Sequence, residues 1–222
     1  MAKGSLSNAR ATWDLKSVMD ADGSKMAPVT SSGRNSAPAW SPDGKQIAFM
    51  KQEGILSIYV MNSNGSQPKW LGATHGKTTR LAWAPDGKQI AYQDEQDGVA
   101  RISLIGVSFG GLTSAAAVSS GGDGHPAWSP DGKHLAYLKY TTSAQVYVSN
   151  ADGTAERAVT NGSGGHGWPT WAPDGRYIAF EGNLTGTLQV YVIGVDGHGQ
   201  RLLTTLPGAS FAPGWAGPVS RA

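Results

Sequence analysis

The chain of 222 residues contains no cysteine. A disulfide framework and a thiolate metal site are therefore excluded, and the protein can fold in an oxidising or a reducing compartment. Charge is also scarce, because charged residues make up 15% of the chain and the formal net charge is +2. Lysine and arginine are scattered among acidic residues, without the basic stripe that binds nucleic acid, so we expect no nucleic-acid partner.

Long apolar runs and helical periodicity are missing too. No segment approaches the ~20 apolar residues of a transmembrane helix, so we expect no membrane insertion. The first residues, Met1 to Ser5, do not lead into the apolar run of a signal peptide, as expected for a mature or excised domain. Nowhere do apolar residues recur at the spacing of an amphipathic helix. These absences leave an all-β class.

A repeat occupies most of the chain. A Trp-Ser/Ala-Pro-Asp-Gly motif occurs four times, and a truncated copy surrounds Trp215; its tryptophans follow one another at intervals of 43 to 45 residues. Self-similarity at a fixed period indicates one supersecondary unit repeated along the chain. The four full motifs are Trp40–Gly44, Trp83–Gly87, Trp128–Gly132 and Trp171–Gly175.

Each motif predicts a hairpin. Proline and aspartate favour the corners of a tight turn, and glycine supplies the left-handed residue that lets an antiparallel strand leave in register. Apolar runs such as Ile47–Phe49 follow the motif, and a second run such as Ile58–Val60 follows about ten residues later. A further turn and a short last strand complete the unit. Four strands in each repeat predict the blades of a β-propeller.

The two ends of the chain carry complementary half-repeats. Complete repeats start near residues 37, 80, 125 and 168, whereas residues 6–30 match the back half of a repeat and residues 209–217 match the front half. We therefore predict a single domain, residues 1–222, forming a five-bladed β-propeller of four-stranded antiparallel blades. The N- and C-terminal strands would share one blade, which closes the ring and removes the exposed sheet edges. A monomer is expected; the alternative is pairing of the open ends with another copy.

The repeat resembles that of the TolB-type β-propellers. The resemblance rests on Trp-Ser/Ala-Pro-Asp-Gly-Lys followed by Ile-Ala-Phe/Tyr and by Ile-Tyr-Val-Met-Asn, and it covers residues 6 to 217. It implies a binding or scaffold domain and a periplasmic or extracellular location. Similar blades occur in oligogalacturonate lyases and in prolyl-oligopeptidase-type enzymes. By the same resemblance, TolB has six blades and an additional α/β domain, and this chain departs from both.

Variation between repeats is concentrated in the loops before the innermost strands, which should open on one face around the channel mouth. Loops on a rigid scaffold are where binding residues usually lie. We predict a noncatalytic propeller that recognises a peptide, a protein or a small polar ligand at this face, without a cofactor. An engineered or excised propeller without an evolved ligand is also consistent with so regular a repeat. The predicted ligand-binding residues are Arg80, Asp123, His125, His166 and Trp168.

Two enzymatic alternatives arise from the same sequence. His75, His125 and His166 could form the metal site of a polysaccharide lyase or hydrolase, for which the oligogalacturonate-lyase resemblance implies manganese. They lie eight, three and five residues before their tryptophans, an unequal spacing that favours ordinary loop histidines and no metal. Ser108 lies in a G-x-S-x-G sequence like a nucleophile elbow, but no helix-forming segment follows. We predict a glycine-rich hairpin there and no catalytic residue.

Overall fold

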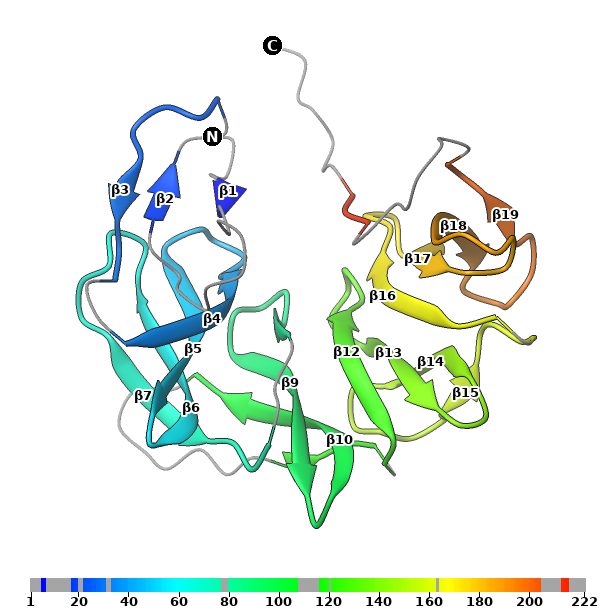
Figure 1. Cartoon of the computed structure of the whole chain (residues 1–222), viewed down its shortest axis with the longest axis horizontal. Helices are drawn as coiled ribbons and strands as arrows, with labels where there is room; N and C mark the ends of the chain where they lie inside the picture. Colours follow the sequence, from blue (N-terminus) through cyan, green and yellow to red (C-terminus); the bar gives the residue numbers. More distant parts are fainter. Residues whose placement is uncertain are drawn as a thin grey trace. The chain divides into compact units, whose positions relative to one another are not determined.

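The computed structural model describes residues 5–6, 17–19, 22–30, 33–76, 80–107, 116–119, 121–162, 164–204 and 213–215. In these residues every regular element is a β-strand. Consequently, the described part of the chain has no helix of the length and apolarity needed to cross a membrane. The strands form five sheets, labelled in Figure 1. The all-β prediction is confirmed.

Four of the sheets have four strands each, and the first has three. In every sheet, strands that follow one another along the chain are neighbours, as in a meander of hairpins. The first sheet contains β1 (Ser5–Leu6), β2 (Ser17–Met19) and β3 (Ala27–Pro28), and the second contains β4 (Arg34–Trp40), β5 (Gln46–Glu53), β6 (Ile55–Asn62) and β7 (Lys69–Ala73). The third contains β8 (Leu81–Trp83), β9 (Gln89–Gln96), β10 (Val99–Gly106) and β11 (Ala116–Ala117). The fourth contains β12 (Asp123–Trp128), β13 (His134–Tyr140), β14 (Ala144–Asn150) and β15 (Arg157–Ala158), and the fifth contains β16 (His166–Trp171), β17 (Tyr177–Gly182), β18 (Gln189–Gly194) and β19 (Arg201–Leu202).

The repeated turns have the predicted chemistry. In the first motif, Asp43 accepts the backbone N–H of Lys45 at 3.0 Å, and Gly44 has a φ of +71°. The glycines of the other three motifs have φ values of 70–71°. Each turn aspartate is thus held by its own turn, and its role is structural.

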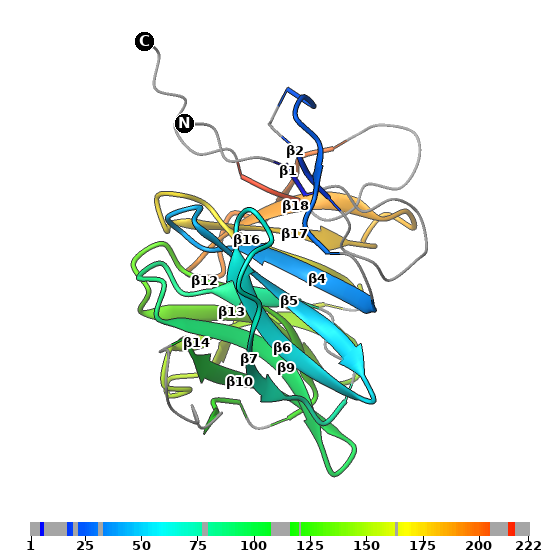
Figure 2. The same ribbon diagram turned by 90° about the vertical axis from the view of Figure 1, so that its left-hand side faces the viewer.

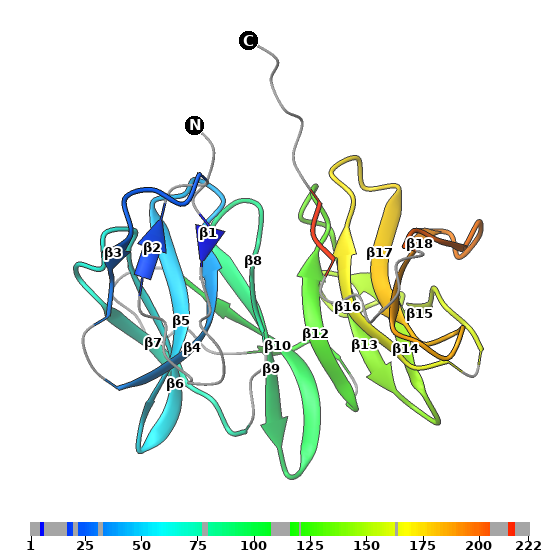
Figure 3. The same ribbon diagram turned by 45° about the horizontal axis from the view of Figure 1, so that its top comes forward.

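The chain divides into two compact units, and each is described by itself. The first comprises Met1–Gly98 and Ser103–Ala116, and the second comprises Val99–Ile102 and Ala117–Ala222. In the first unit, Figure 2 shows β4, β5 and β6 side by side, and one core packs between their sheet and the β8–β11 sheet. In the second unit, seen in Figure 3, the β12–β15 and β16–β19 sheets enclose a core that includes Leu138, Trp171 and Phe180.

The blade predicted to combine the two chain ends is not seen as a sheet in the described residues. The strands of the first sheet all come from residues 5–28, and the described residues 213–215 do not form a strand. Residues 205–212 and 216–222, which would supply the rest of the front half, lie outside the described residues, as does Ser108 with its G-x-S-x-G sequence.

Candidate functional site

A β-bulge interrupts three of the innermost strands at the same repeat position. The pairing register shifts between Ser36 and Ala39 in β4, between Gly124 and Ala127 in β12, and between Gly167 and Thr170 in β16. Such a bulge adds an unpaired residue, bends the strand and re-aims a side chain. The residue three positions before each tryptophan has a left-handed backbone, with φ of +47° at Ala37, +55° at His125 and +46° at Trp168.

Two predicted site residues, His125 and Trp168, meet at this position. Their ring centroids lie 4.5 Å apart at an interplanar angle of 57°, and both side chains are half-buried. A left-handed backbone at a non-glycine residue costs about 1 kcal/mol or more. Ala37 adopts the same left-handed backbone conformation. The fold therefore determines the backbone conformation at this position, whereas the type of side chain can vary. In the second unit this position holds His125 and Trp168, whose rings are in contact.

Arg80 occupies the same repeat position in the first unit. It directly precedes β8, three residues before Trp83, and it is half-buried. Burial lowers the pKa of the Arg80 guanidinium below its ordinary value. Three of the five predicted ligand residues therefore share one repeat position, and the bulge with its left-handed backbone is seen at two of them, His125 and Trp168. The common spacing of three residues before the tryptophan is the sequence signal that identifies it.

Asp123 lies two residues before His125 and is fully buried, with an exposed fraction of 0%. Its Oδ2 atom accepts the backbone N–H of Gly121 at 3.0 Å. Burial raises the pKa of this carboxyl, and hydrogen bonds from Ser119 and Gly121 offset part of that rise. Lys139, its cross-strand neighbour, is engaged by Glu156 at 2.6 Å. The buried Asp123 side chain thus stabilises the start of β12 through its hydrogen bond with Gly121.

His166 is also buried, at 5% exposure, two residues before Trp168. Its Nδ1 atom lies 2.8 Å from the carbonyl oxygen of Ala144, and its ring packs 5.1 Å from that of Phe180. A carbonyl only accepts, so Nδ1 carries the proton and Nε2 the lone pair. Burial lowers the pKa of His166, because the charged ring is poorly solvated there. His166 anchors the start of β16 in a neutral form.

His75 belongs to the first unit. Its backbone N–H and its Nδ1 atom contact the Asp94 carboxylate at 2.8 and 3.1 Å. Asp94 is only 8% exposed, so the carboxylate that holds His75 is itself buried. Across the described ranges, no three histidine or carboxylate side chains gather closely enough to hold a metal ion.

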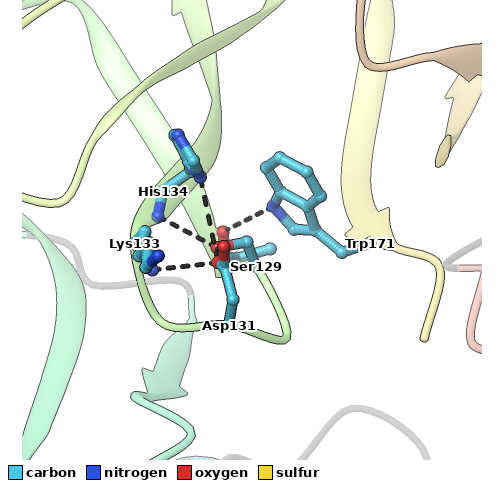
Figure 4. A network of polar contacts seen from close by, with 6 residues as sticks. Ser129, Asp131, Lys133, His134 and Trp171 are labelled. Carbon is cyan, nitrogen blue, oxygen red and sulfur yellow. Dashed lines mark hydrogen bonds and ion pairs between the residues drawn. The ribbon is translucent and has the colours of Figure 1, made fainter. Parts of the chain in front are cut away.

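A serine, an aspartate and a histidine come together in the turn between β12 and β13 (Figure 4). Ser129 Oγ donates to Asp131 at 2.6 Å, and the backbone N–H of His134 donates to Ser129 Oγ at 2.9 Å. This order differs from a catalytic triad, in which histidine accepts the serine proton. The turn after β4 repeats both bonds with Gln46 in place of His134. The hydrogen bonds of this cluster therefore stabilise the turn.

An open groove of about 490 Å³ adjoins this turn within the second unit. Trp171 and Val148 contribute apolar surface, and Arg157 donates to the carbonyl oxygen of Val195 at 2.7 Å, which ties the fourth sheet to the fifth. A groove with corresponding repeat residues lies beside Trp215. Since it recurs with the repeat, we regard the groove as part of the architecture.

Antiparallel four-stranded sheets repeated at a fixed interval, with tryptophans packed between neighbours, define the chain as a β-propeller protein. The sequence profile of the TolB beta propeller domain matches residues 10–120 and 111–218. The chain belongs to the TolB β-propeller family. No curated protein matches its sequence.

Solved structures with the same fold include TolB proteins. A TolB-type protein from Agrobacterium tumefaciens superposes with a TM-score of 0.73 at 22% identity, covering 84% of this chain and 72% of the other. TolB from Acinetobacter baumannii gives 0.73 and 22%, covering 85% and 48%. An oligogalacturonate lyase in complex with manganese gives 0.66 and 15%, covering 86% and 59%. The chain thus spans about half of the second structure and under two thirds of the third, and at these identities the similarity concerns the fold alone.

Proposed function

We propose that this chain is a noncatalytic binding or scaffold propeller whose ligand, a peptide, a protein or a small polar molecule, contacts His125 and Trp168. One observation carries the proposal. A single bulge position, with one backbone conformation, holds alanine in β4 but a histidine and a tryptophan in contact in the second unit. Large aromatic side chains on a rigid scaffold are typical anchors for a partner.

The other predicted residues have different parts in this proposal. Arg80 would contribute a charged donor from the same position of its own repeat, and guanidinium groups are frequent in binding sites. Asp123 and His166 would act indirectly, as supports of the site. Each is buried two residues before a bulge residue, and its hydrogen bond holds the backbone that leads into the bulge. The lyase alternative finds no support in the described histidines.

Peptide selection tests this function. Peptides selected from a random library on the intact protein would be titrated by calorimetry against wild type, Trp168→Ala and Trp70→Ala. Trp70 is a matched control because it is 49% exposed on the outer strand β7. We expect Trp168→Ala to weaken binding at least tenfold, equivalent to about 1.4 kcal/mol, and Trp70→Ala to leave it unchanged. Equal binding to Trp168→Ala, or no selectable peptide, would contradict the proposal.

We also propose that residues 1–222 form one five-bladed domain closed by its two ends. The three-stranded first sheet is one strand short of the others, which supports a missing innermost strand. Trp215 donates from Nε1 to the carbonyl oxygen of Thr170 at 3.3 Å, so the segment after β19 carries a tryptophan placed as in an innermost strand.

A further inference from the structure

The tripeptide Asn-Gly-Ser occurs twice in the chain, as residues 64–66 and as residues 161–163. Asparagine is a thermolabile residue. It is most reactive before glycine, which has no side chain to shield the backbone nitrogen that attacks the asparagine amide. Because the two tripeptides are identical, their intrinsic reactivities are closely matched. Asn64 and Asn161 are both exposed to solvent, so a difference in reactivity must come from how the fold holds each of them.

The first tripeptide lies in the turn between β6 and β7, where hydrogen bonds hold both reacting groups. Asn64 Oδ1 accepts the backbone N–H of Ser66 at 3.0 Å and the hydroxyl of Ser66 at 2.7 Å. The backbone N–H of Gly65, the attacking group, donates to the carbonyl oxygen of Asn62 at 2.9 Å. A Cβ atom placed on Gly65 would lie 2.7 Å from the carbonyl oxygen of Val29, so the turn is also closely packed. The fold therefore restrains Asn64.

This restraint belongs to the repeated turn. Asp152 and Asp196 take the place of Asn64 in the equivalent turns of the second unit. Each accepts the backbone N–H of the residue two positions later, at 2.9 and 3.0 Å. The glycine after each aspartate donates to the carbonyl oxygen three residues earlier, at 2.9 Å. Asn64 thus has the structural role of a turn aspartate.

The second tripeptide lies outside these turns, in the loop between β15 and β16. Over the described residues, neither the Asn161 side chain nor the backbone N–H of Gly162 makes a hydrogen bond. Gly162 is held through its carbonyl oxygen, which accepts Gln145 Nε2 at 2.9 Å and Ser143 Oγ at 3.3 Å. No atom of the described chain lies within 4 Å of a Cβ atom placed on Gly162. Both reacting groups are therefore free to approach each other.

We propose that Asn161 is a site of spontaneous deamidation in the folded protein, whereas Asn64 is protected. The backbone nitrogen of Gly162 attacks Cγ of Asn161, so that a new N–Cγ bond forms. The Cγ–Nδ2 bond breaks, and ammonia leaves with the proton that the backbone nitrogen gives up. Water then opens the cyclic succinimide at either carbonyl carbon, which gives aspartate or isoaspartate. Water is the co-reactant, and no electrons are transferred.

This inference goes beyond the proposed binding function and does not depend on it. Either product adds a negative charge, and isoaspartate also adds a methylene group to the main chain, five residues before His166. The loop leads directly into β16, which contains the proposed anchor Trp168. Deamidation would therefore change, as the protein ages, the segment that leads into the proposed site.

Peptide mapping of the intact protein tests the difference between the two asparagines. Folded protein would be incubated in warm, mildly alkaline buffer, digested and analysed by mass spectrometry, with isoaspartate detected by an isoaspartyl methyltransferase. A parallel sample in concentrated guanidinium chloride provides the unfolded reference. We expect similar rates for both asparagines in denaturant, but conversion of Asn161 at least tenfold faster than that of Asn64 in the folded protein. A smaller difference, or no conversion of Asn161 in the folded protein, would overturn the proposal.

Two matched variants give a second readout. Glutamine cyclises far more slowly than asparagine, because its longer side chain would close a larger ring. Asn161→Gln should therefore abolish the acidic forms that accumulate in aged protein, seen by isoelectric focusing, whereas Asn64→Gln should leave them unchanged. Acidic forms that persist undiminished in Asn161→Gln would contradict the assignment. Since neither readout requires a ligand, a failure here is distinct from a failure of peptide binding at Trp168.

Discussion

At the scale of single residues, the indole of the repeated tryptophan does two things. Trp171 is 8% exposed and fills the space between the fourth and fifth sheets, and its N–H bonds to a backbone carbonyl of the fourth. A buried aromatic side chain of this size dominates local packing. One residue therefore supplies both the apolar contact and the alignment of two neighbouring sheets.

Replacing Trp171 by phenylalanine should separate these two contributions. The change keeps an aromatic ring but removes the N–H that bonds to the Ala127 carbonyl oxygen, together with part of the buried area. We expect the free energy of unfolding to fall by about 2–3 kcal/mol, measured by urea denaturation. Trp70→Phe, on an exposed outer strand, should change it by less than about 0.5 kcal/mol. Equal effects of the two changes would show that the inter-sheet bond has no role in stability.

The buried carboxyl of Asp123 makes a prediction about pH. Its pKa is raised by burial, so the folded state holds the proton more tightly than the unfolded state. The stability that this group contributes is present below the ordinary pKa of 3.8 and is lost as pH rises through the folded-state pKa. Asp123→Asn, which keeps an acceptor for Gly121, should therefore be more stable relative to wild type at pH 7 than at pH 3.5.

Glu156 is the internal control for that experiment. Burial acts to raise its pKa, but Lys139 and Tyr137 outweigh burial and lower it. Its contribution is present above the ordinary pKa of 4.5 and is lost as pH falls through the folded-state pKa. Glu156→Gln should accordingly be destabilised most at pH 7 and least in acid, the opposite trend to Asp123→Asn. Unfolding curves at several pH values measure both; parallel trends would refute the assignment.

At the scale of elements, each blade is a meander whose turns require left-handed residues at set places. The turn after the third strand has a residue two positions beyond its glycine with positive φ: Lys25, Gln67, Ala155 and Gly199, at φ of 52–69°. Only the last is glycine. The repeat therefore tolerates strain at this position when the side chain points to solvent.

Gly199→Ala should reveal that strain. No atom lies within 4 Å of a Cβ placed at Gly199, so the cost comes from the left-handed backbone alone. We expect a loss of about 1 kcal/mol in the free energy of unfolding. Gly165→Ala, where φ is ordinary and the space is also open, should change it little or stabilise slightly. A destabilisation at Gly165 as large as that at Gly199 would contradict this explanation.

At the scale of the whole molecule, the proposed ring determines whether the chain associates with other copies. A propeller without closure leaves sheet edges and a blade face exposed, which invites association. The proposed shared blade would remove these exposed edges within one chain. Ring closure and the solution state are thus linked.

Light scattering measures that state directly. We expect a particle of one chain, 23.1 kDa, whose mass does not change with protein concentration. A concentration-dependent mass for the wild type would show that copies pair through their ends and would refute the monomeric ring.

The sequence by itself determined the repeat, its hairpins and the structural role of the turn aspartates. These depend on local chemistry: Pro-Asp-Gly specifies a turn within five residues, and a period of two specifies a strand. The fold class and the family resemblance followed from those patterns alone. The sequence also placed the predicted site residues in the segments that lead into the innermost strands.

Only the tertiary structure decided which residues of those segments are buried and which are partly exposed. Polar and glycine-rich sequences around Asp123 and His166 were expected at an exposed rim, but packing buries both side chains. His125 and Trp168 each lie in a β-bulge, one formed where β12 pairs with β13 and the other where β16 pairs with β17. Burial and bulge geometry depend on residues far apart in the chain, so local propensities could not reveal them.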